Sequence, residues 1–388
     1  MKIVIAPDSF KESLSALEAA HAIEKGLKGI FPDAEYIKLP MADGGEGTVQ
    51  SLVDATNGSI VECEVTGPLG EPVQAFFGMM GDKKTAVIEM AAASGLHLVP
   101  QGSRNPLITT TKGTGELILA ALDYGAEDII VGIGGSATND GGAGMIQALG
   151  GSLMDPSGNE IEPGGGSLAQ LASIDLSGLD PRLQAVRIQV ACDVDNPLTG
   201  PRGASVVFGP QKGATPGMVE ELDRSLSHFA DIAEKTLGMS LRNKEGAGAA
   251  GGLGASLMGV LNAELKRGIE IVLQAVNFED VVKDADLVIT GEGRIDSQTI
   301  CGKTPVGVAK AAKKYGVPVI ALAGSLSDDS SVVYEHGIDA LFSIVPGVTS
   351  LSEAFEQAGQ NMERTARNIA ASMKIESSSL RGKREANT

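Results

Sequence analysis

Short apolar runs alternate with amphipathic stretches near both ends of the chain, which predicts a sheet covered by helices. The apolar run at 3–6 predicts a buried strand, and apolar residues with helical spacing predict a helix over 16–30 that begins with a capping box between Ser15 and Glu18. The same alternation predicts further strands and helices, at 35–39, 286–290, 304–315, 318–322, 341–345 and 351–373. We expect the strands of both ends to form one doubly wound parallel sheet.

The middle of the chain has a different pattern. Short strands at 60–65, 73–77 and 85–90, joined by Gly, Pro and Asp turns, predict an antiparallel meander. A strand at 186–191 and a helix at 216–237, with Pro at its start, are predicted later. The chain is therefore predicted to divide into three parts: a discontinuous α/β domain of residues 1–57 and 281–375, an inserted α/β domain of residues 58–280, and a flexible tail of residues 376–388.

Composition limits the partners of this chain. Of its 388 residues, 43% are apolar and only 3% aromatic, and 51 glycines suit many tight turns between strands and helices. The formal net charge of −18 repels phosphate backbones and anionic lipid, so we expect neither nucleic acid nor a membrane as a partner. An anionic ligand must be held by local groups.

The cysteines and the N-terminus predict a cytoplasmic protein. Cys63, Cys192 and Cys301 are odd in number and far apart, which fits neither a disulfide framework nor a zinc site. The first apolar run is too short for the core of a signal peptide, and no later run approaches membrane-spanning length.

Residues 132–145 predict a phosphate-binding loop between a strand at 128–131 and a helix at 143–149. Glycines allow positive φ and close approach of a ligand, while hydroxyl and amide side chains offer donors. We expect the first amides of the helix to point back into the loop and to add partial positive charge there. The residues that we assign to phosphate binding are Gly134, Gly135, Ser136, Thr138 and Asn139.

Two other interpretations of this loop stay open. The glycines could serve only the sterics of a sharp turn between strand and helix. Gly132, Gly134 and Ala137 also match a dinucleotide-binding fingerprint, with Asp155 at about the distance suited to a ribose. This match is weak, because polar residues and two more glycines separate Ala137 from the helical pattern.

Polar residues also follow the first two predicted strands, where open α/β sheets bind ligands. Ser9 and Lys11, next to Asp8, come after the first strand, and Asp43 and Glu46 come after the second. Lys11 could instead be a solvated loop lysine, and Asp43 could cap the following helix.

Several motifs, in this order and spacing, make the chain similar to a known family. They are APDSFK at 6–11, ADGGEGT at 42–48, GIGGSATNDGG at 132–142, ACDVDNP at 191–197, GPQKG at 209–213, GAAGGLG at 248–254 and GEGRID at 291–296. Over residues 1–372 the chain resembles the bacterial type 1 glycerate kinase family. The resemblance implies ATP-dependent phosphorylation of D-glycerate to 2-phosphoglycerate, with the 3-hydroxyl not excluded. It also implies a flavodoxin-like domain with a large inserted α/β domain.

The residues must also supply the chemistry of phosphoryl transfer, which needs held phosphates, a divalent cation, a base and cations near the moving group. A full P-loop is missing, since 302–304 match only its end. For the base we favour Asp193, which follows an apolar strand and whose pKa partial burial could raise. Asp195 is the competitor, and either aspartate could instead cap the turn.

Glycerate is a carboxylate and needs cations to receive it. We assign Arg294, with Ser9 and Lys11, to substrate binding, Lys11 also to catalysis, and Asp296 or Asp43 to Mg²⁺. A solvated Arg294 is the alternative. Glu12, where some members of the family have Gly, leaves the conformation of the first loop open.

The expected partners are D-glycerate and ATP with Mg²⁺, and a homodimer is possible in principle. The alternative functions are an NAD(P)-dependent oxidoreductase acting on a small hydroxy acid and, third, a non-catalytic solute-binding protein. The sequence decides neither the range of hydroxy acids accepted nor which domain binds adenine.

Overall fold

The structure, a computed structural model, describes residues 1–385 of the chain, with side chains through Ile375. It is a mixed α/β protein that divides into two compact units. Unit 1 is Met1–Asp43 with Val272–Thr388, and unit 2 is Gly44–Ile271. No helix of the described chain is long and apolar enough to cross a membrane.

Unit 1 contains a five-stranded sheet with the order β13-β12-β11-β1-β2, and every neighbouring pair is parallel. Both ends of the chain contribute, because β1 pairs with β11 through a register that joins Pro7 to Gly291. The predicted strands at both ends are confirmed. Their bounds are β1 Lys2–Pro7, β2 Glu35–Lys38, β11 Leu287–Ile295, β12 Val319–Leu326 and β13 Ala340–Ser343.

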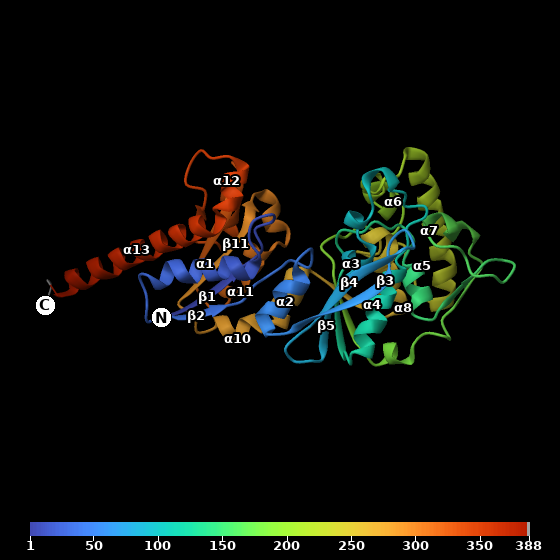
Figure 1. The fold of residues 1–388 in the computed structure, drawn as a ribbon, viewed down its shortest axis with the longest axis horizontal. Helices are drawn as coiled ribbons and strands as arrows, with labels where there is room; N and C mark the ends of the chain where they lie inside the picture. The colour runs from blue at the N-terminus through green and yellow to red at the C-terminus, as the bar shows by residue number, and fades with distance from the viewer. Residues whose placement is uncertain (386–388) are drawn as a thin grey trace. The chain divides into compact units, whose positions relative to one another are not determined.

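Helices cover both faces of this sheet. Helices α1 (Ala16–Lys28) and α13 (Ala358–Glu385) lie side by side, and their apolar residues share one core with Ile3 and Ile5 of β1 (Figure 1). Because successive side chains of a strand point to opposite faces of the sheet, Val4 lies on the other face, where α11 (Thr304–Lys313) packs. The capping box at the start of α1 is confirmed. The remaining helices assigned wholly to unit 1 are α10 Phe278–Val282 and α12 Leu351–Glu356.

The C-terminal helix differs from its prediction in two ways. The single helix expected at 351–373 is broken at Gln357 into α12 and α13. Helix α13 then continues to Glu385, into the segment 376–388 that the sequence assigned to a flexible tail. Residues 386–388 lie outside the described residues.

Unit 2 contains a mixed six-stranded sheet with the order β10-β9-β6-β5-β4-β3. The expected antiparallel meander is confirmed in β3, β4 and β5, while β5, β6, β9 and β10 are parallel neighbours. The bounds are β3 Ser59–Thr66, β4 Pro72–Met79, β5 Thr85–Glu89, β6 Asp128–Gly132, β9 Arg187–Ala191 and β10 Glu264–Lys266, with a separate antiparallel pair β7 Ser152–Met154 and β8 Ser173–Asp175.

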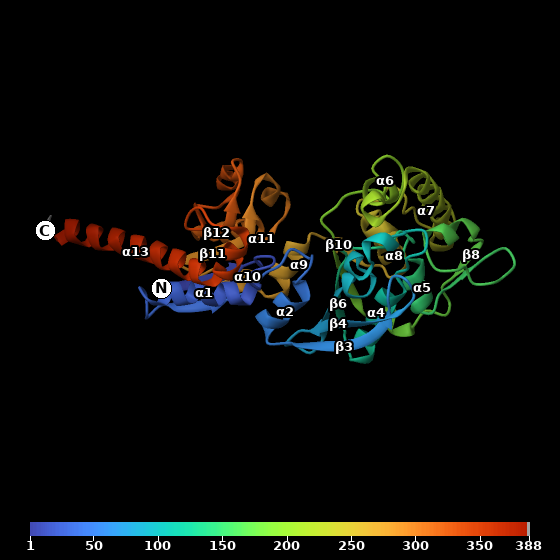
Figure 2. The same cartoon turned by 45° about the horizontal axis from the view of Figure 1, so that its top comes forward.

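Helices of unit 2 pack on this sheet and on one another, as Figure 2 shows for α4, α5 and α8 around β3, β4 and β6. Helix α2 belongs to this unit, whereas the sequence assigned it to the first domain. Gly78 of β4 lacks a side chain at the point where Val49 and Val53 of α2 pack. The helices are α2 Thr48–Thr56, α3 Ala91–Ser94, α4 Lys112–Asp123, α5 Ala143–Ala148, α6 Ala204–Phe208, α7 Pro216–Leu237 and α8 Leu253–Val260, and α9 Gly268–Ala275 spans the second boundary between the units.

Candidate active site

Strands β1 and β11 lie next to each other in unit 1, and the chain leaves them toward opposite edges of the sheet. From β1 it continues to β2 on one side, and from β11 to β12 on the other. In open α/β sheets such a switch in direction leaves a crevice at the carboxyl ends of the two strands, where ligands bind. Asp8 follows β1 at this end, and its amide donates to the Gly291 carbonyl at 2.8 Å.

Asp8 is held in a partly buried hydrogen-bond network. The Ser9 amide lies 2.6 Å from Oδ1 of Asp8, and the Thr304 hydroxyl donates to Oδ2. Burial, reinforced by the nearby Asp43 carboxylate, raises the pKa of Asp8 to about 6, although the hydrogen bonds from Thr304 and Ser9 oppose the shift. Asp8 can therefore exchange a proton near neutral pH.

Glu292 is a second buried carboxyl at this end of the sheet, and sequence reasoning missed it. Oε1 accepts a hydrogen bond from the Thr299 hydroxyl at 2.6 Å, and Oε2 lies 3.6 Å from Nζ of Lys303. Burial raises its pKa to about 7, with Asp8 and Asp43 adding to the effect and Thr299 and Lys303 opposing it. The strand was expected to end at 290, so Glu292 was placed in a loop, although it stands in one of the motifs that carry the family resemblance.

The structure thus brings Asp8, Asp43 and Glu292 near one another in unit 1. Carboxyls with raised pKa values, as in Asp8 and Glu292, are typical of sites that bind or transform ligands. The cluster arises because the loops after β1 and β2 and the end of β11 all lie at the carboxyl edge of one parallel sheet.

The predicted substrate ligands of unit 1 have mixed surroundings. Lys11 is exposed on the loop after β1, and Ser9 bonds to Asp8. Glu12 takes a left-handed conformation, with φ of 64°, which explains why Gly suits this position. Arg294 is two-thirds exposed, and its Nε lies 3.2 Å from Oδ2 of Asp296.

The predicted metal ligands were also located. The Asp296 carboxylate accepts the amide of Gln298 at 2.9 Å and caps a short 3-10 helix at Ser297–Cys301, besides pairing with Arg294. Within the described chain no group of three or more His, Cys, Asp or Glu side chains is arranged to hold a metal ion. Mg²⁺ that accompanies nucleotide phosphates needs only one or two carboxylates from the protein, and the oxygen ligands at Asp43 and Asp296 are of the type that it prefers.

In unit 2 the glycine-rich loop follows β6 as predicted. Gly135 has φ of 73°, and its carbonyl accepts the amide of Leu96 at 2.8 Å. Gly134 and Gly135 are exposed, and the amides of 134–136 have no hydrogen-bond acceptor among residues 1–385. Exposed unpaired amides in a glycine turn can receive an anion.

The rest of the predicted phosphate ligands are buried beneath this turn. Ser136 is 7% exposed, and Thr138 and Asn139 are fully buried. Asn139 donates to the Ser205 hydroxyl at 3.0 Å. Thr138 Oγ1 and Asn139 Oδ1 are buried without a partner among the described residues.

The expected contribution of helix α5 to the loop is wrong, because Asp140 occupies its first amides. The carboxylate of Asp140 accepts the amides of Gly142 at 3.1 Å and Gly144 at 3.3 Å, and the amide and hydroxyl of Thr111 both at 2.8 Å. Burial raises the pKa of Asp140, and these four donors oppose the shift. The helix amides are therefore not available to an anion.

A buried cation that sequence reasoning missed lies under the loop. Lys212 is 1% exposed and follows α6 in a 3-10 helix, Pro210–Lys212. Its Nζ donates to Ser136 Oγ and to the Thr138 carbonyl, both at 2.6 Å. The only sequence signal was its place in the 209–213 motif.

The two candidate bases in unit 2 differ in their surroundings. Asp193 is exposed, so the expected partial burial is wrong, and its Oδ1 accepts the amide of Gly268 at 3.2 Å. Asp195 is paired with Arg202 at 2.8 Å, and this hydrogen bond lowers the pKa of Asp195. A carboxylate paired with arginine is a weaker base than an unpaired one, which argues against Asp195 as the base.

The dinucleotide interpretation does not fit the loop. Helix α5 begins at Ala143, well after Ala137, whereas the fingerprint needs the helix to start at its third small residue. Asp155 is instead bound in a turn by the amides of Ser157 and Asn159.

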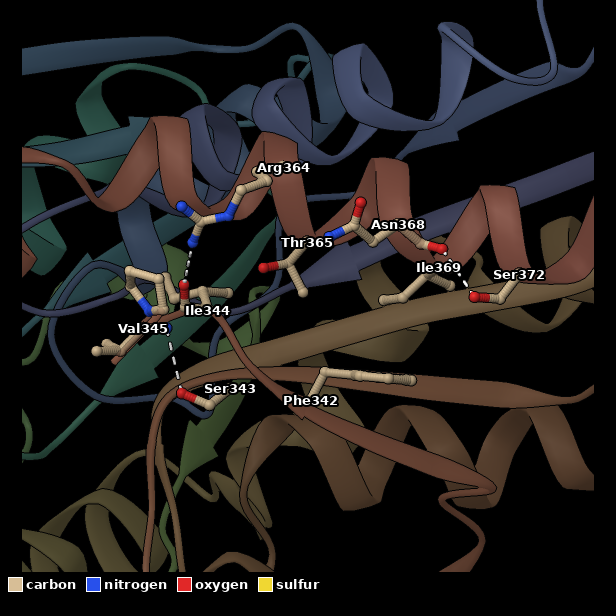
Figure 3. A pocket seen from close by; sticks show the side chains of 10 residues that line it. Phe342, Ser343, Ile344, Val345, Arg364, Thr365, Asn368, Ile369 and Ser372 are labelled. Atoms are coloured by element: carbon tan, nitrogen blue, oxygen red, sulfur yellow. Dashed lines mark hydrogen bonds between the residues drawn. The ribbon is translucent and has the colours of Figure 1, made fainter. Parts of the chain in front are cut away.

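Unit 1 also has a groove of about 420 Å³ between the end of β13 and α13 (Figure 3). In it Arg364 donates to the Ile344 carbonyl at 3.3 Å, and the Val345 amide donates to Ser343 Oγ at 3.2 Å. The lining contains no carboxylate, so the groove lacks the acid and base groups found at the ends of β1 and β11.

Comparisons with known proteins cover nearly the whole chain. A family model described as "Glycerate kinase family" matches residues 3–374. The "Glycerate kinase" of Bacillus subtilis (strain 168) is 75% identical over 375 residues, covering 97% of this chain and 98% of that protein. The "Glycerate 2-kinase" of Escherichia coli (strain K12) is 62% identical over 375 residues, covering 97% and 98%. A crystal structure from Salmonella typhimurium LT2 has a TM-score of 0.91 and 59% identity, covering 97% of this chain and 99% of that one.

Proposed function

The chain belongs to the glycerate kinase family and is a phosphotransferase with an alcohol group as acceptor, and from this premise we propose its substrate, product and site. It transfers the terminal phosphoryl group of ATP, with Mg²⁺, to the 2-hydroxyl of D-glycerate and releases 2-phosphoglycerate and ADP. The observation that carries this proposal is the 62% identity over 97% of the chain to a relative named glycerate 2-kinase. The relatives give no support to the oxidoreductase alternative.

Unit 1 is proposed to be a flavodoxin-like domain interrupted by the insertion of unit 2. In its own chain order the sheet reads 2-1-3-4-5, which is the flavodoxin-like order. The switch point of that order lies between β1 and β11, where Asp8 and Glu292 stand. This supports the carboxyl ends of these strands as a ligand site.

In unit 2, the loop at 134–139 is proposed to hold the phosphates of ATP. The exposed Gly134–Gly135 turn and the free amides of 134–136 support this assignment. The buried Thr138 and Asn139 are proposed to shape the loop from below, through the Thr138 carbonyl that accepts from Lys212 and the Asn139 amide that donates to Ser205. Hydrogen bonds to phosphate oxygens would stabilise the charge that builds up during transfer.

Asp193 is proposed as the base that accepts the proton of the attacking hydroxyl. Its carboxylate is exposed and accepts the amide of Gly268, so it can approach a substrate hydroxyl, and proton transfer in the transition state increases the rate. Asp195 is proposed to be the ion-pair partner of Arg202 and not the base.

In unit 1, Ser9, Lys11 and Arg294 are proposed to receive the carboxylate of glycerate, with Lys11 also close to the reacting group. Asp43 is the favoured protein ligand for Mg²⁺, because its carboxylate lies near those of Asp8 and Glu292, and Asp296 is the alternative. Mg²⁺ would neutralise charge on the phosphates. We place the reaction in the cytoplasm.

The test is to supply the purified full chain with ATP, Mg²⁺ and D-glycerate and to follow ADP. Formation of ADP that depends on glycerate supports the kinase, and its absence overturns the proposal. A phosphorus NMR spectrum of the product distinguishes 2-phosphoglycerate from 3-phosphoglycerate and therefore tests the acceptor hydroxyl separately.

A further inference from the structure

Lys212 is fixed beneath the glycine loop by the local fold. The residue after it, Gly213, has φ of 94°, and a side chain there would collide with the Arg104 carbonyl. The chain therefore turns sharply behind the lysine and directs its ammonium group toward Ser136 and Thr138. A flexible surface lysine would not be held in this way.

The ammonium group has no anionic partner of its own. Within the described chain Nζ donates to the Ser136 hydroxyl and the Thr138 carbonyl and forms no ion pair, although the charge of Asp140 acts on it from a greater distance. Asp140 is already occupied by the donors of Thr111, Gly142 and Gly144. Burial consequently lowers the pKa of Lys212 to about 7, and only Asp140 opposes the shift.

Polar atoms around the lysine are also unsatisfied. Thr138 Oγ1, Asn139 Oδ1 and Arg104 Nε are buried without a partner in the described part of the chain. Buried polar groups are normally paired, and the Thr138 hydroxyl and Arg104 Nε are donors that an anionic ligand could satisfy, whereas Asn139 Oδ1 can only accept. An anion next to Ser136 would supply the missing charge.

We propose that Lys212 is a positioning residue for the phosphate tail of a nucleoside triphosphate bound at 134–136, and that it acts through the Ser136 hydroxyl and the Thr138 carbonyl. It supplies the positive charge that helix α5 cannot, since Asp140 occupies the first amides of that helix. This inference rests on the proposed function, because the proposed phosphate loop is the site that it completes.

The two possible roles of Lys212, bracing the loop and positioning a phosphate, predict opposite effects of its removal on stability. A buried cation without a carboxylate partner destabilises the folded state, so replacing Lys212 by an apolar residue of similar length should not lower the melting temperature. If the lysine only braced the loop, its removal would lower the melting temperature and leave phosphate selectivity unchanged.

The experiment measures binding of Mg·ATP and of adenosine to the full chain by calorimetry, for wild type and for Lys212→Met. We expect Lys212→Met to weaken ATP binding by about 10-fold to 100-fold while adenosine binding stays within about twofold of wild type and the melting temperature does not fall. The matched control is Lys84→Met, which removes an exposed lysine paired with Glu127 and should change neither affinity. Equal ATP affinity in Lys212→Met and wild type overturns the inference.

A second measurement needs no substitution and covers the case in which Lys212→Met does not fold. Above its pKa of about 7 unliganded Lys212 is mostly deprotonated, so ATP binding must include uptake of a proton. Between pH 7.5 and 9 the ATP affinity of the wild type should therefore fall by up to about tenfold per pH unit while adenosine affinity stays flat. The charged group that acts on Lys212 is Asp140 in the loop, and the main chain of Arg104 packs on the neighbouring Gly213. ATP affinity that does not change over this range contradicts the inference.

Failure of this inference and failure of the proposed function are distinguishable. Production of ADP from glycerate together with unchanged ATP binding by Lys212→Met rejects only the role of Lys212. ATP binding that depends on Lys212 without any glycerate-dependent ADP rejects the glycerate kinase proposal and keeps the phosphate site.

Discussion

The Nζ atom of Lys212 lies 2.6 Å from the Oγ atom of Ser136, a residue 76 positions earlier in the chain. This contact joins a 3-10 helix to the loop that follows β6 and puts a positive charge below the exposed Gly134–Gly135 turn. Many phosphate loops use the start of a helix for the same purpose. Here Asp140 caps that helix, and the lysine takes over the electrostatic role.

Replacement of Asp193 by Asn should lower kcat by at least ~10²-fold with little change in KM, because a general base acts in the transition state and contributes little to ground-state binding. Steady-state kinetics with glycerate and ATP measure this. Asp195→Asn is the matched variant and should retain most activity, since Asp195 is paired with Arg202. Near wild-type kcat in Asp193→Asn, or a larger loss in Asp195→Asn, would reassign the base.

Replacement of Glu292 by Gln should stabilise the protein, and more so at pH 8 than at pH 5.5. The folded-state pKa of Glu292, about 7, lies above its ordinary value of 4.5, so the stability it contributes is complete at low pH and is lost as pH rises through 7. At pH 8 the ionised carboxyl costs about 3 kcal/mol relative to the neutral amide. Urea unfolding at the two pH values tests this, and a variant less stable than wild type at pH 8 would refute it.

Replacement of Asp140 by Ala should destabilise the chain by about 3 kcal/mol, because it leaves buried donors of Thr111, Gly142 and Gly144 without an acceptor. Thermal unfolding gives the measurement. The control is Asp155→Ala, which removes an exposed turn carboxylate and should cost much less. Similar losses in the two variants would show that Asp140 does not fix the start of α5.

Replacement of Gly291 by Ala should destabilise unit 1 by about 1–3 kcal/mol, because the new methyl group would lie 2.3 Å from the Leu322 carbonyl of the neighbouring strand. The added side chain would push apart β11 and β12 near Glu292. Gly217→Ala in α7 is the matched control, with no atom within 4 Å of the added group. It should be neutral or slightly stabilising by helix propensity. Circular dichroism melts of both variants make the comparison.

Local patterns predicted most elements because their causes are local. Helix α7 has the predicted bounds, since Pro216 suits its first turn and Gly238 takes a left-handed conformation at its end. Strand β11 was predicted too short because Gly291 and Gly293 are poor strand residues, yet pairing with β12 keeps the chain extended to Ile295. A contact with a neighbouring strand overrode the propensity of the segment.

The candidate site was only partly predictable for the same reason. The sequence predicted that Ser9 and Lys11 follow the end of a strand. The strand order supports a ligand site at that end of the sheet. Thr111, which donates to Asp140, and Ser136, which accepts from Lys212, lie 29 and 76 residues from these partners, so no spacing rule could identify the two contacts. The sequence also suggested partial burial of Asp193, whereas the carboxylate proved exposed, because the path of a turn after a strand depends on tertiary packing.

The pairing of β1 with β11 has a consequence for synthesis of the chain. About 250 residues separate the end of β2 from the start of β11, which takes roughly 12–50 s at ribosomal rates of 5–20 residues per second. During that interval unit 2 can complete its own sheet, while β1 and β2 wait without their central neighbour and with unpaired backbone groups. The nascent chain is therefore most exposed to aggregation at its oldest end, and a chaperone acting on it would have to hold the first forty residues until the last hundred emerge.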